Sequence, residues 1–259
     1  MTRIATWNVN SLKARLPRVE EWITLAQPDI LCIQETKMKN EAFPTEAFTA
    51  LGYESVHHGQ GQWNGVAIIS RVGIKNVTSG FDDLEDPYEG DARLIAATCG
   101  GLRTVNVYVP NGREVPSEFY DRKLLWLAQL KNWLTTTSSP KDSVVVLGDF
   151  NVAPEDKDVW SMEAFAGLTH VTELEREAIA ALEEWGLSDS FRQLHQEDGL
   201  YSFWDYRGGD FHKKHGMRID LVLASKAVEK RVTSALIDRD ARKGEKPSDH
   251  APVVIELSD

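Results

Sequence analysis

The sequence predicts an α/β fold: a four-layer sandwich in which two packed, mixed β-sheets are flanked by helices. Short apolar runs rich in β-branched residues recur along the chain, and helical spacing separates only some of them. Several neighbouring runs are joined as hairpins rather than crossovers, which two sheets with helices outside accommodate well. At 259 residues, 42% of them hydrophobic, the chain fits one large domain, and we expect residues 1–259 to form it.

Strands are predicted wherever an apolar, β-branched run of four to eight residues stands between turn residues. In chain order these are Ile4–Val9, Asp29–Gln34, Gly65–Ser70, Arg93–Thr98, Thr104–Val109, Ser143–Leu147, Met217–Ala224 and Val253–Leu257.

Two segments show helical spacing instead. Between Tyr120 and Leu134, apolar residues recur every three or four positions and share one face. The same spacing occurs from Leu174 to Trp185. This second helix should begin after Thr172, because Thr172 and Glu175 have the spacing of a capping box, and it should end at Gly186.

Composition and the first residues of the sequence indicate the cellular environment and the class of partner. A strand-like segment begins at Arg3, so we expect no signal peptide, and no apolar run approaches the roughly 20 residues of a membrane span. Both cysteines, Cys32 and Cys99, lie in strand-like runs and should be buried thiols. We therefore expect a soluble, cytoplasmic monomer without a membrane partner. The net charge of −11 suits a protein that gathers carboxylates around a metal, but counts against DNA binding unless basic patches are local.

Polar side chains gather where the apolar runs end. They are Asn8, Glu35, Tyr108, Asp149, Asn151, Asp220, Asp249 and His250. One such residue means little, because strand ends carry turn chemistry. Together they supply the oxygen ligands, amide and imidazole of a hydrolytic centre that holds a hard divalent cation and a phosphate.

Two features of this set constrain the geometry. Asp149 and Asn151 are two residues apart in extended chain, so both side chains leave the same face of a strand end. Asp220 interrupts the apolar run Arg218–Leu223, where an unpaired buried carboxylate would cost several kcal/mol. Asp220 therefore needs a partner, and His250 is a plausible one.

Ordered motifs across the chain resemble those of the exonuclease III family of abasic-site endonucleases, within the endonuclease/exonuclease/phosphatase superfamily. They are Thr6–Asn10 (TWNVN), Gln34–Lys37 (QETK), Val107–Gly112 (VYVPNG), Gly148–Asn151 (GDFN), Arg218–Asp220 (RID) and Ser248–His250 (SDH). The Gly-Asp-x-Asn and Ser-Asp-His elements also occur in DNase I-like, sphingomyelinase-like and inositol-phosphatase-like relatives. Phe203–Arg207 (FWDYR) and Arg218–Asp220 resemble the DNA-repair branch.

The resemblance implies roles for these residues. Glu35 would bind Mg²⁺ or Mn²⁺, with Asn8 arranging the metal site and Asp249 near enough to contribute. Asp149 would orient or deprotonate the attacking water. Asn151 and Tyr108 would hold the scissile phosphate, while His250, held by Asp220, would stabilise charge in the transition state. The set offers oxygens and no thiolate, which favours a hard metal.

The resemblance also implies a small apolar pocket for a sugar that lacks its base. The matching residues are Phe203, Trp204, Met217 and Ile219. The alternative is that some of these side chains are ordinary core. Met217 departs from the family pattern, where Trp or Leu is common, and a flexible Met would shape the pocket less strictly.

Positive charge is concentrated near the same motifs. The segment 207–218 holds most of it, and the candidate DNA contacts are Arg113, Arg207, Lys213, Lys214 and Arg218. Charged loops are usually solvated faces, but positive clusters beside the site, on a chain that is negative elsewhere, fit steering toward phosphates. The sequence does not rank these residues.

The sequence thus predicts a Mg²⁺- or Mn²⁺-dependent DNA-repair phosphodiesterase. It would cut duplex DNA 5′ to abasic sites, with 3′→5′ exonuclease and 3′-end trimming activity. One alternative is a phosphatase or phosphodiesterase for a small molecule or lipid headgroup on the same scaffold. A second is a DNA-binding scaffold with a decayed site, which is disfavoured because each proposed catalytic position has a competent side chain.

Overall fold

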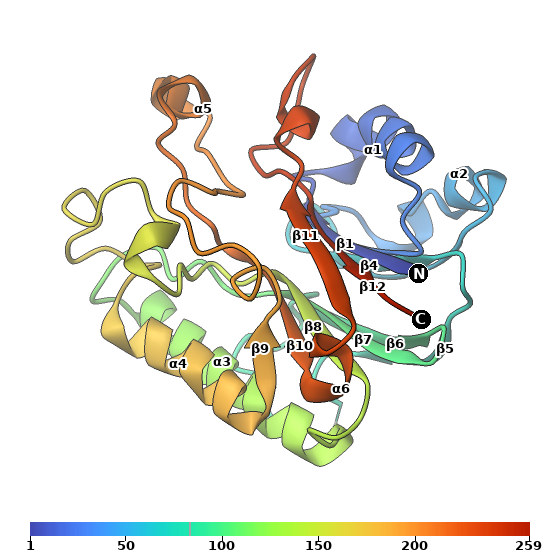
Figure 1. Cartoon of the computed structure of the whole chain (residues 1–259), viewed down its shortest axis with the longest axis horizontal. Helices are drawn as coiled ribbons and strands as arrows, with labels where there is room; N and C mark the ends of the chain where they lie inside the picture. The colour runs from blue at the N-terminus through green and yellow to red at the C-terminus, as the bar shows by residue number, and fades with distance from the viewer. Residues whose placement is uncertain (83) are drawn as a thin grey trace.

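The computed structural model describes residues 1–82 and 84–259. Two six-stranded sheets pack face to face, and helices cover the outer side of each (Figure 1). The predicted four-layer α/β sandwich is confirmed. The apolar face of each sheet is buried against the other sheet, while the opposite face is buried against helices, which is why the strands are apolar on both sides.

The first sheet has the strand order β11-β12-β1-β2-β4-β3. Its strands are β1 (Thr2–Asn8), β2 (Ile30–Gln34), β3 (Glu54–His58), β4 (Val66–Ser70), β11 (Val232–Ile237) and β12 (Val253–Leu257). Strands β1 and β2 are parallel, and the other neighbours are antiparallel. Both β1 and β2 therefore end at the same edge of the sheet, and this brings Asn8 and Glu35 into contact.

The second sheet has the order β5-β6-β7-β8-β10-β9. Its strands are β5 (Lys75–Ser79), β6 (Leu94–Cys99), β7 (Leu102–Tyr108), β8 (Val144–Asp149), β9 (Leu187–Asp189) and β10 (Asp220–Ser225). Strands β7 and β8 are parallel, so Tyr108 and Asp149 lie side by side at their carboxyl ends. Strand β10 runs antiparallel to β8, with Asp220 opposite Asp149.

Helices cover the two outer faces. The long ones are α1 (Leu12–Ala26), α3 (Glu118–Thr137) and α4 (Glu173–Trp185), and the shorter ones are α2 (Thr45–Ala50), α5 (Asp210–Lys213) and α6 (Lys226–Glu229), with 3₁₀ turns η1 (Asn40–Ala42), η2 (Asp156–Asp158), η3 (Arg207–Gly209) and η4 (Arg239–Arg242). Helices α1 and α2 pack on the first sheet, and α3 and α4 on the second. The capping box of Thr172 and Glu175 and the C-cap at Gly186 are confirmed.

The three largest apolar clusters among the described residues fill the layers of the sandwich. One lies between the sheets and includes Ile4, Val145 and Val222, and the other two lie between each sheet and its helices. The inter-sheet layer also holds a polar pair: Gln34 Nε2 donates to Asn106 Oδ1 over 2.7 Å, and Asn106 Nδ2 donates to the carbonyl of Ile33 over 2.9 Å. Because a buried amide is costly unless it is paired, these bonds fix how the end of β2 sits on the second sheet.

The predicted strands match β1, β2, β4, β6, β7, β8, β10 and β12, with ends that coincide or are shifted by up to three residues. The predicted start of one strand was wrong, and the error changes the position of a predicted site residue. Asp220 does not interrupt a strand; it begins β10, and residues 217–219 precede the strand. Cys32 and Cys99 are buried free thiols, as predicted. Among the described residues, no helix has the length and apolar character to span a membrane.

Candidate active site

The strand ends that carry polar residues meet at one cavity of about 680 Å³. Its floor and walls include Glu35, Tyr108, Asp149, Asn151, Phe203, Met217, Ile219, Asp249 and His250. These residues come from both sheets and lie far apart in the sequence. Most of the residues predicted from motifs are thus brought together at one edge of the sandwich.

Gly148 explains how Asp149 reaches this position. Gly148 has φ +148°, and a Cβ placed on this glycine would lie 1.9 Å from the carbonyl oxygen of Val107 on the neighbouring strand. Only glycine allows β8 to approach β7 this closely. The glycine before the aspartate is therefore a requirement of the backbone rather than of the chemistry.

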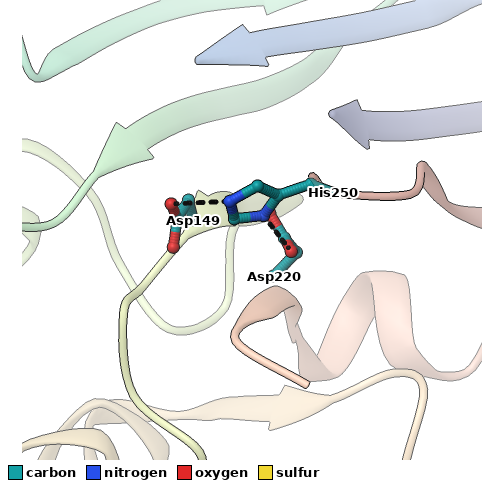
Figure 2. Close-up of side chains that lie close together, drawn as sticks. All are labelled: Asp149, Asp220 and His250. Carbon is teal, nitrogen blue, oxygen red and sulfur yellow. Dashed lines mark hydrogen bonds and ion pairs between the residues drawn. The ribbon is translucent and has the colours of Figure 1, made fainter. Parts of the chain in front are cut away.

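Three side chains lie close together at the centre of the site, with the His250 ring between the carboxylates of Asp149 and Asp220 (Figure 2). His250 Nδ1 lies 2.8 Å from Asp220 Oδ2, and His250 Nε2 lies 3.8 Å from Asp149 Oδ2. All three side chains are almost completely buried. The predicted pairing of Asp220 with His250 is confirmed, and it holds the ring with its second nitrogen toward Asp149.

Burial and charge act in opposite directions on these groups. Burial lowers the pKa of His250, but the charges of Asp220 and Asp149 outweigh it and raise the pKa to about 10. The ring is therefore a cation at neutral pH, with a hydrogen on each nitrogen. Burial raises the pKa of the Asp149 carboxyl, which makes it a stronger base than an ordinary aspartate.

Asn8 connects the two halves of the site. Its Nδ2 donates to Glu35 Oε1 over 2.8 Å and to Asp149 Oδ2 over 2.9 Å, while its Oδ1 accepts from the backbone N–H of Asn10 over 2.9 Å. Asn8 is fully buried. The amide therefore bridges the carboxylates of Glu35 and Asp149, and its role in arranging a metal site stays a prediction.

Glu35 faces the cavity from the end of β2. Its Oε2 lies 2.8 Å from the Lys37 ammonium. Burial raises the pKa of the Glu35 carboxyl, but the Lys37 charge and hydrogen bonds from Lys37 and Asn8 bring it below its usual value. The carboxyl is thus ionised and able to hold a cation.

The donor set suits a metal ion. One atom each from Asp149, Asp220 and His250 lie within 4.8 Å of one another, so a buried cluster of acids and a histidine has the spacing of a metal site. A protonated His250 donates at both nitrogens and does not ligate. Glu35 and Asp249 therefore stay the predicted ligands of a hard cation.

Two asparagines follow strands β7 and β8 at the edge of the cavity. Asn151 has φ +51°, a left-handed conformation, and its Nδ2 donates to the carbonyl of Val109 over 2.9 Å. Asn111 Nδ2 donates to Asn151 Oδ1 over 3.1 Å. Beside them, burial and the charges of Glu35 and Asp149 raise the pKa of Tyr108 well above its ordinary value. Tyr108 thus remains a neutral phenol.

An apolar wall closes one side of the cavity. Phe203, Met217 and Ile219 contribute to it, and the ring centroid of Phe203 lies 4.8 Å from that of His250. Trp204, also predicted here, is not part of the wall. It is 1% exposed and packs with Tyr201 and Ala251. The assignment of Trp204 to the substrate pocket was wrong because its side chain is core.

Of the five candidate DNA contacts, four are exposed and one is buried. Arg113 and Arg207 are exposed and line the cavity. Lys213 and Lys214 are exposed at the end of α5, in an arm that extends from the sandwich (Figure 1). Arg218 is fully buried, with Nε 2.6 Å from Asp158 Oδ1 and Nη1 2.7 Å from Asp189 Oδ2. Arg218 is therefore a structural ion-pair residue, and its assignment to DNA was wrong.

Residues 5–250 match the model of the Endonuclease/Exonuclease/phosphatase family. The chain belongs to the endonuclease/exonuclease/phosphatase family. It is 33% identical to exodeoxyribonuclease III of Haemophilus influenzae over 98% of this chain and 99% of that protein. An AP endonuclease from Archaeoglobus fulgidus has a similar structure, with a TM-score of 0.96, 38% identity and full coverage of both chains. So does the 3′ phosphatase NExo from Neisseria, solved with a product DNA hairpin, with a TM-score of 0.94, 39% identity and full coverage of both chains.

The sequence analysis did not predict several residues that line this cavity, including Asn111, Thr169 and two further polar residues. Asn10 and His170 both line the cavity. Asn10 stands in the same motif as Asn8, so its position was a usable signal. His170 gave no signal, because it lies in an irregular segment just before the capping box of α4.

The ring of His170 is held in its neutral form. Its Nδ1 lies 2.6 Å from the carbonyl oxygen of Asn151, and its Nε2 lies 3.5 Å from Asn111 Nδ2. A neutral ring with hydrogen on Nδ1 satisfies both contacts. Burial, with the Lys123 charge adding to it, lowers the pKa of His170 to about 4.

We expect His170 to make stability depend on pH. Its folded pKa lies below the unfolded value near 6.5, so the contribution is complete above pH 6.5 and is lost as the pH falls toward 4. Between pH 7 and pH 5, the wild type should lose about 2 kcal/mol more unfolding free energy than His170→Asn. Urea unfolding of both proteins at the two pH values measures the difference. Equal losses would show that His170 is charged in the folded state.

Proposed function

We propose that this protein is a metal-dependent DNA-repair phosphodiesterase. It hydrolyses the backbone of duplex DNA 5′ to abasic sites and also removes nucleotides and blocking groups from 3′ ends. One observation carries the proposal: His250, fixed by Asp220, points toward a buried Asp149 at a cavity that Glu35 also lines. The names of the similar proteins, exodeoxyribonuclease III, AP endonuclease and 3′ phosphatase, support it over the lipid or small-molecule alternative.

The proposed division of labour follows from the geometry. Asp149, basic and hydrogen-bonded, aims a water molecule at the phosphorus and accepts its proton. His250, a cation held by Asp220, donates to a phosphoryl oxygen as negative charge develops. Tyr108 and Asn151 donate to the other oxygens of the scissile phosphate. Because the donors are fixed before the substrate arrives, little reorganisation is needed in the transition state.

Glu35 and Asp249 would hold the metal, with Asn8 orienting the Glu35 carboxylate. When bound, Mg²⁺ or Mn²⁺ would supply positive charge to the phosphoryl and leaving oxygens. The ionised, partly enclosed carboxyl of Glu35 and the lack of a thiolate among the cavity residues fit a hard cation.

The apolar wall supports an abasic sugar as the group that enters the cavity. Phe203, Met217 and Ile219 offer surface to a deoxyribose without a base, while a normal nucleotide would have to place its base there as well. Residues 1–259 would act as one domain, as a cytoplasmic monomer.

Arg113 and Arg207 stand at the cavity and would contact phosphates flanking the incision. Arg113 lies over the ring of Phe119, with 3.6 Å between its Cζ and the ring centroid, and Arg207 is almost fully exposed. Both are local positive charges on a chain of net charge −11. Such charges steer and position DNA without performing chemistry.

The exposed arm that carries α5 gives a further prediction. If Lys213 and Lys214 meet phosphates, changing both to Glu should weaken duplex binding and flatten the dependence of log K on log salt. Each lost contact removes about 0.9 from the slope magnitude. Turnover at saturating DNA should fall much less than kcat/KM. Fluorescence anisotropy in Ca²⁺ on one abasic duplex, at several salt concentrations, measures this.

Lys226 and Lys230 supply the control. Both are exposed at the α6 end of the molecule, which lies away from α5 (Figure 1). Their double change to Glu alters net charge by the same amount and should leave the slope unchanged. Equal slopes for wild type and the Lys213/Lys214 variant would remove the arm from the DNA interface while leaving the catalytic assignment intact.

A substrate panel tests the proposed function as a whole. Abasic duplex, duplex with a recessed 3′ end, 3′-phosphorylated duplex, inositol phosphates and a lipid headgroup phosphodiester are each incubated with and without excess EDTA. We expect turnover of the DNA substrates alone, abolished by EDTA and restored by added Mg²⁺ or Mn²⁺. Turnover of the headgroup or inositol substrates in place of DNA would favour the alternative, and full DNA cleavage in EDTA would refute the metal mechanism.

A further inference from the structure

A lysine lies completely buried beneath the site, and the mechanism above does not use it. Lys123, on α3, is 0% exposed. Lysine is almost never fully buried unless its charge is paired, because removing an ammonium group from water is costly. Burial accordingly lowers the pKa of Lys123, while the nearby Glu175 charge opposes that change. The ammonium must therefore be held by specific acceptors.

Those acceptors belong to three separate segments. Lys123 Nζ lies 2.7 Å from the carbonyl oxygen of Asn151, 3.2 Å from that of Asn111, and 3.3 Å from Thr169 Oγ1, and it forms an ion pair with Glu175. Asn151 follows β8, Asn111 follows β7, and Thr169 precedes α4. One side chain thus joins three loops that each line the cavity.

Glu175 completes the connection. It is also 0% exposed, and its carboxylate accepts from Thr169 Oγ1 over 2.7 Å, from the N–H of His170 over 2.9 Å and from the N–H of Thr172 over 3.1 Å. The same carboxylate therefore caps α4, fixes the segment that carries His170 and neutralises Lys123.

Asn151 is the residue most affected by this network. It has a left-handed backbone, which an asparagine adopts only at some cost. Its carbonyl is held by Lys123, and its N–H donates to Asp149 Oδ1 over 2.9 Å. Lys123, together with His170 Nδ1, thus holds the backbone carbonyl of Asn151, and it also holds that of Asn111. These are the backbone positions from which the two asparagine side chains extend.

We propose that Lys123 is a positioning residue for phosphodiester hydrolysis. Resting on the proposed function, this inference holds that the buried Lys123–Glu175 pair aligns Asn151 and Asn111 with the scissile phosphate, without touching DNA. A misplacement of about 1 Å at such a donor costs up to about 100-fold in rate.

The test separates positioning from stability. Lys123→Met alone leaves a buried, unpaired carboxylate and should destabilise the fold. The double variant Lys123→Met with Glu175→Gln removes both charges, and Gln also serves in a capping box. We expect its melting temperature to recover toward the wild type. Its kcat on abasic duplex should remain about 10- to 100-fold reduced, with Kd in Ca²⁺ changed by less than about threefold.

Two controls make the result specific. Leu130→Ala, on the same helix, cuts a buried side chain in the cluster between α3 and the second sheet; it should lower the melting temperature but not kcat. In an Asn151→Ala background, neutralising Lys123 and Glu175 should have little additional effect on kcat, because the two changes act through one group.

A second readout does not depend on activity. In protein labelled with ¹⁵N-asparagine, the side-chain amide resonances of Asn111 and Asn151 should shift or broaden in the Lys123→Met/Glu175→Gln variant. Wild-type kcat and unchanged resonances in that variant would overturn the proposal and make Lys123 merely the charge partner of Glu175. If the wild type cleaves no DNA, the proposed function fails, and the resonances alone still decide whether Lys123 positions the asparagines.

Discussion

Asp149→Asn should lower kcat on abasic duplex by about 100- to 10,000-fold, the range for losing a general base. Asp149 accepts from Asn8 Nδ2 at one oxygen and from the Asn151 N–H at the other. The substitution keeps the shape of the side chain and one of these two acceptors, while removing the basic carboxylate. Burial raises the pKa of the Asp149 carboxyl, which makes it a stronger base than an ordinary carboxylate. Asp149 is also only 1% exposed, so bulk water has little access to the position from which it would accept the proton. Single-turnover kinetics at saturating enzyme measures the chemical step, and DNA affinity in Ca²⁺ should survive.

Asp158→Asn is the matched control. Asp158 is also buried and carries an ion pair, with Arg218 and Arg192 as partners, but it does not line the cavity. It should lower the melting temperature and leave kcat close to that of the wild type. If Asp149→Asn instead lost DNA affinity as much as rate, Asp149 would serve to build the site rather than to activate water.

His250→Ala should reduce kcat/KM by about 2–4 kcal/mol of transition-state stabilisation, the usual scale for a donor to a developing anion. The ring is buried, cationic and fixed by Asp220, so its donor is in place before the substrate binds. Steady-state kinetics on the abasic duplex gives the loss. An unchanged kcat/KM would refute the role of His250.

Asp220→Ala tests the same pair of side chains from the other partner, because Asp220 holds His250. Without the carboxylate, Nδ1 loses its acceptor and the ring loses both its orientation and part of its positive charge. The single change should therefore cost nearly as much as His250→Ala, and the double variant should add little. Additive losses would mean that Asp220 acts on something other than His250.

Much of the fold could be predicted from the sequence, and the missed strands have a common cause. The strands not predicted are β3, β5, β9 and β11, and these are the edge strands of the two sheets. Edge strands are short and partly exposed, as in Lys75–Ser79, where no residue is fully buried. The apolar pattern that identifies a central strand is therefore weak at an edge. Helix α1 was also missed; it contains Pro17, a residue that usually argues against a helix interior.

The centre of the site was predictable because its residues violate the local pattern. A carboxylate that interrupts an apolar run requires a partner, and this requirement pointed from Asp220 to His250. The remaining residues did not violate anything. Lys123 looks like an exposed position of an amphipathic helix, and only the three-dimensional meeting of three loops reveals its buried acceptors.

Arg218 and Trp204 illustrate the opposite error. Both stand within motifs that carry function, and sequence position alone does not distinguish a cavity residue from its buried neighbour. Arg218 is paired with Asp158 and Asp189, which lie far away in the chain. Those partners could not be identified from spacing, so its charge was assigned to DNA.

The central claim is that water, directed by Asp149, attacks the phosphorus of a DNA phosphodiester. Incision of one abasic duplex in water enriched in heavy oxygen, followed by mass spectrometry of both products, tests it most directly. The claim predicts a 3′-hydroxyl on the upstream strand and a heavy oxygen in the 5′-phosphate of the downstream strand. Cleavage without label in that phosphate, or an unsaturated sugar fragment at the upstream 3′ end, would contradict it.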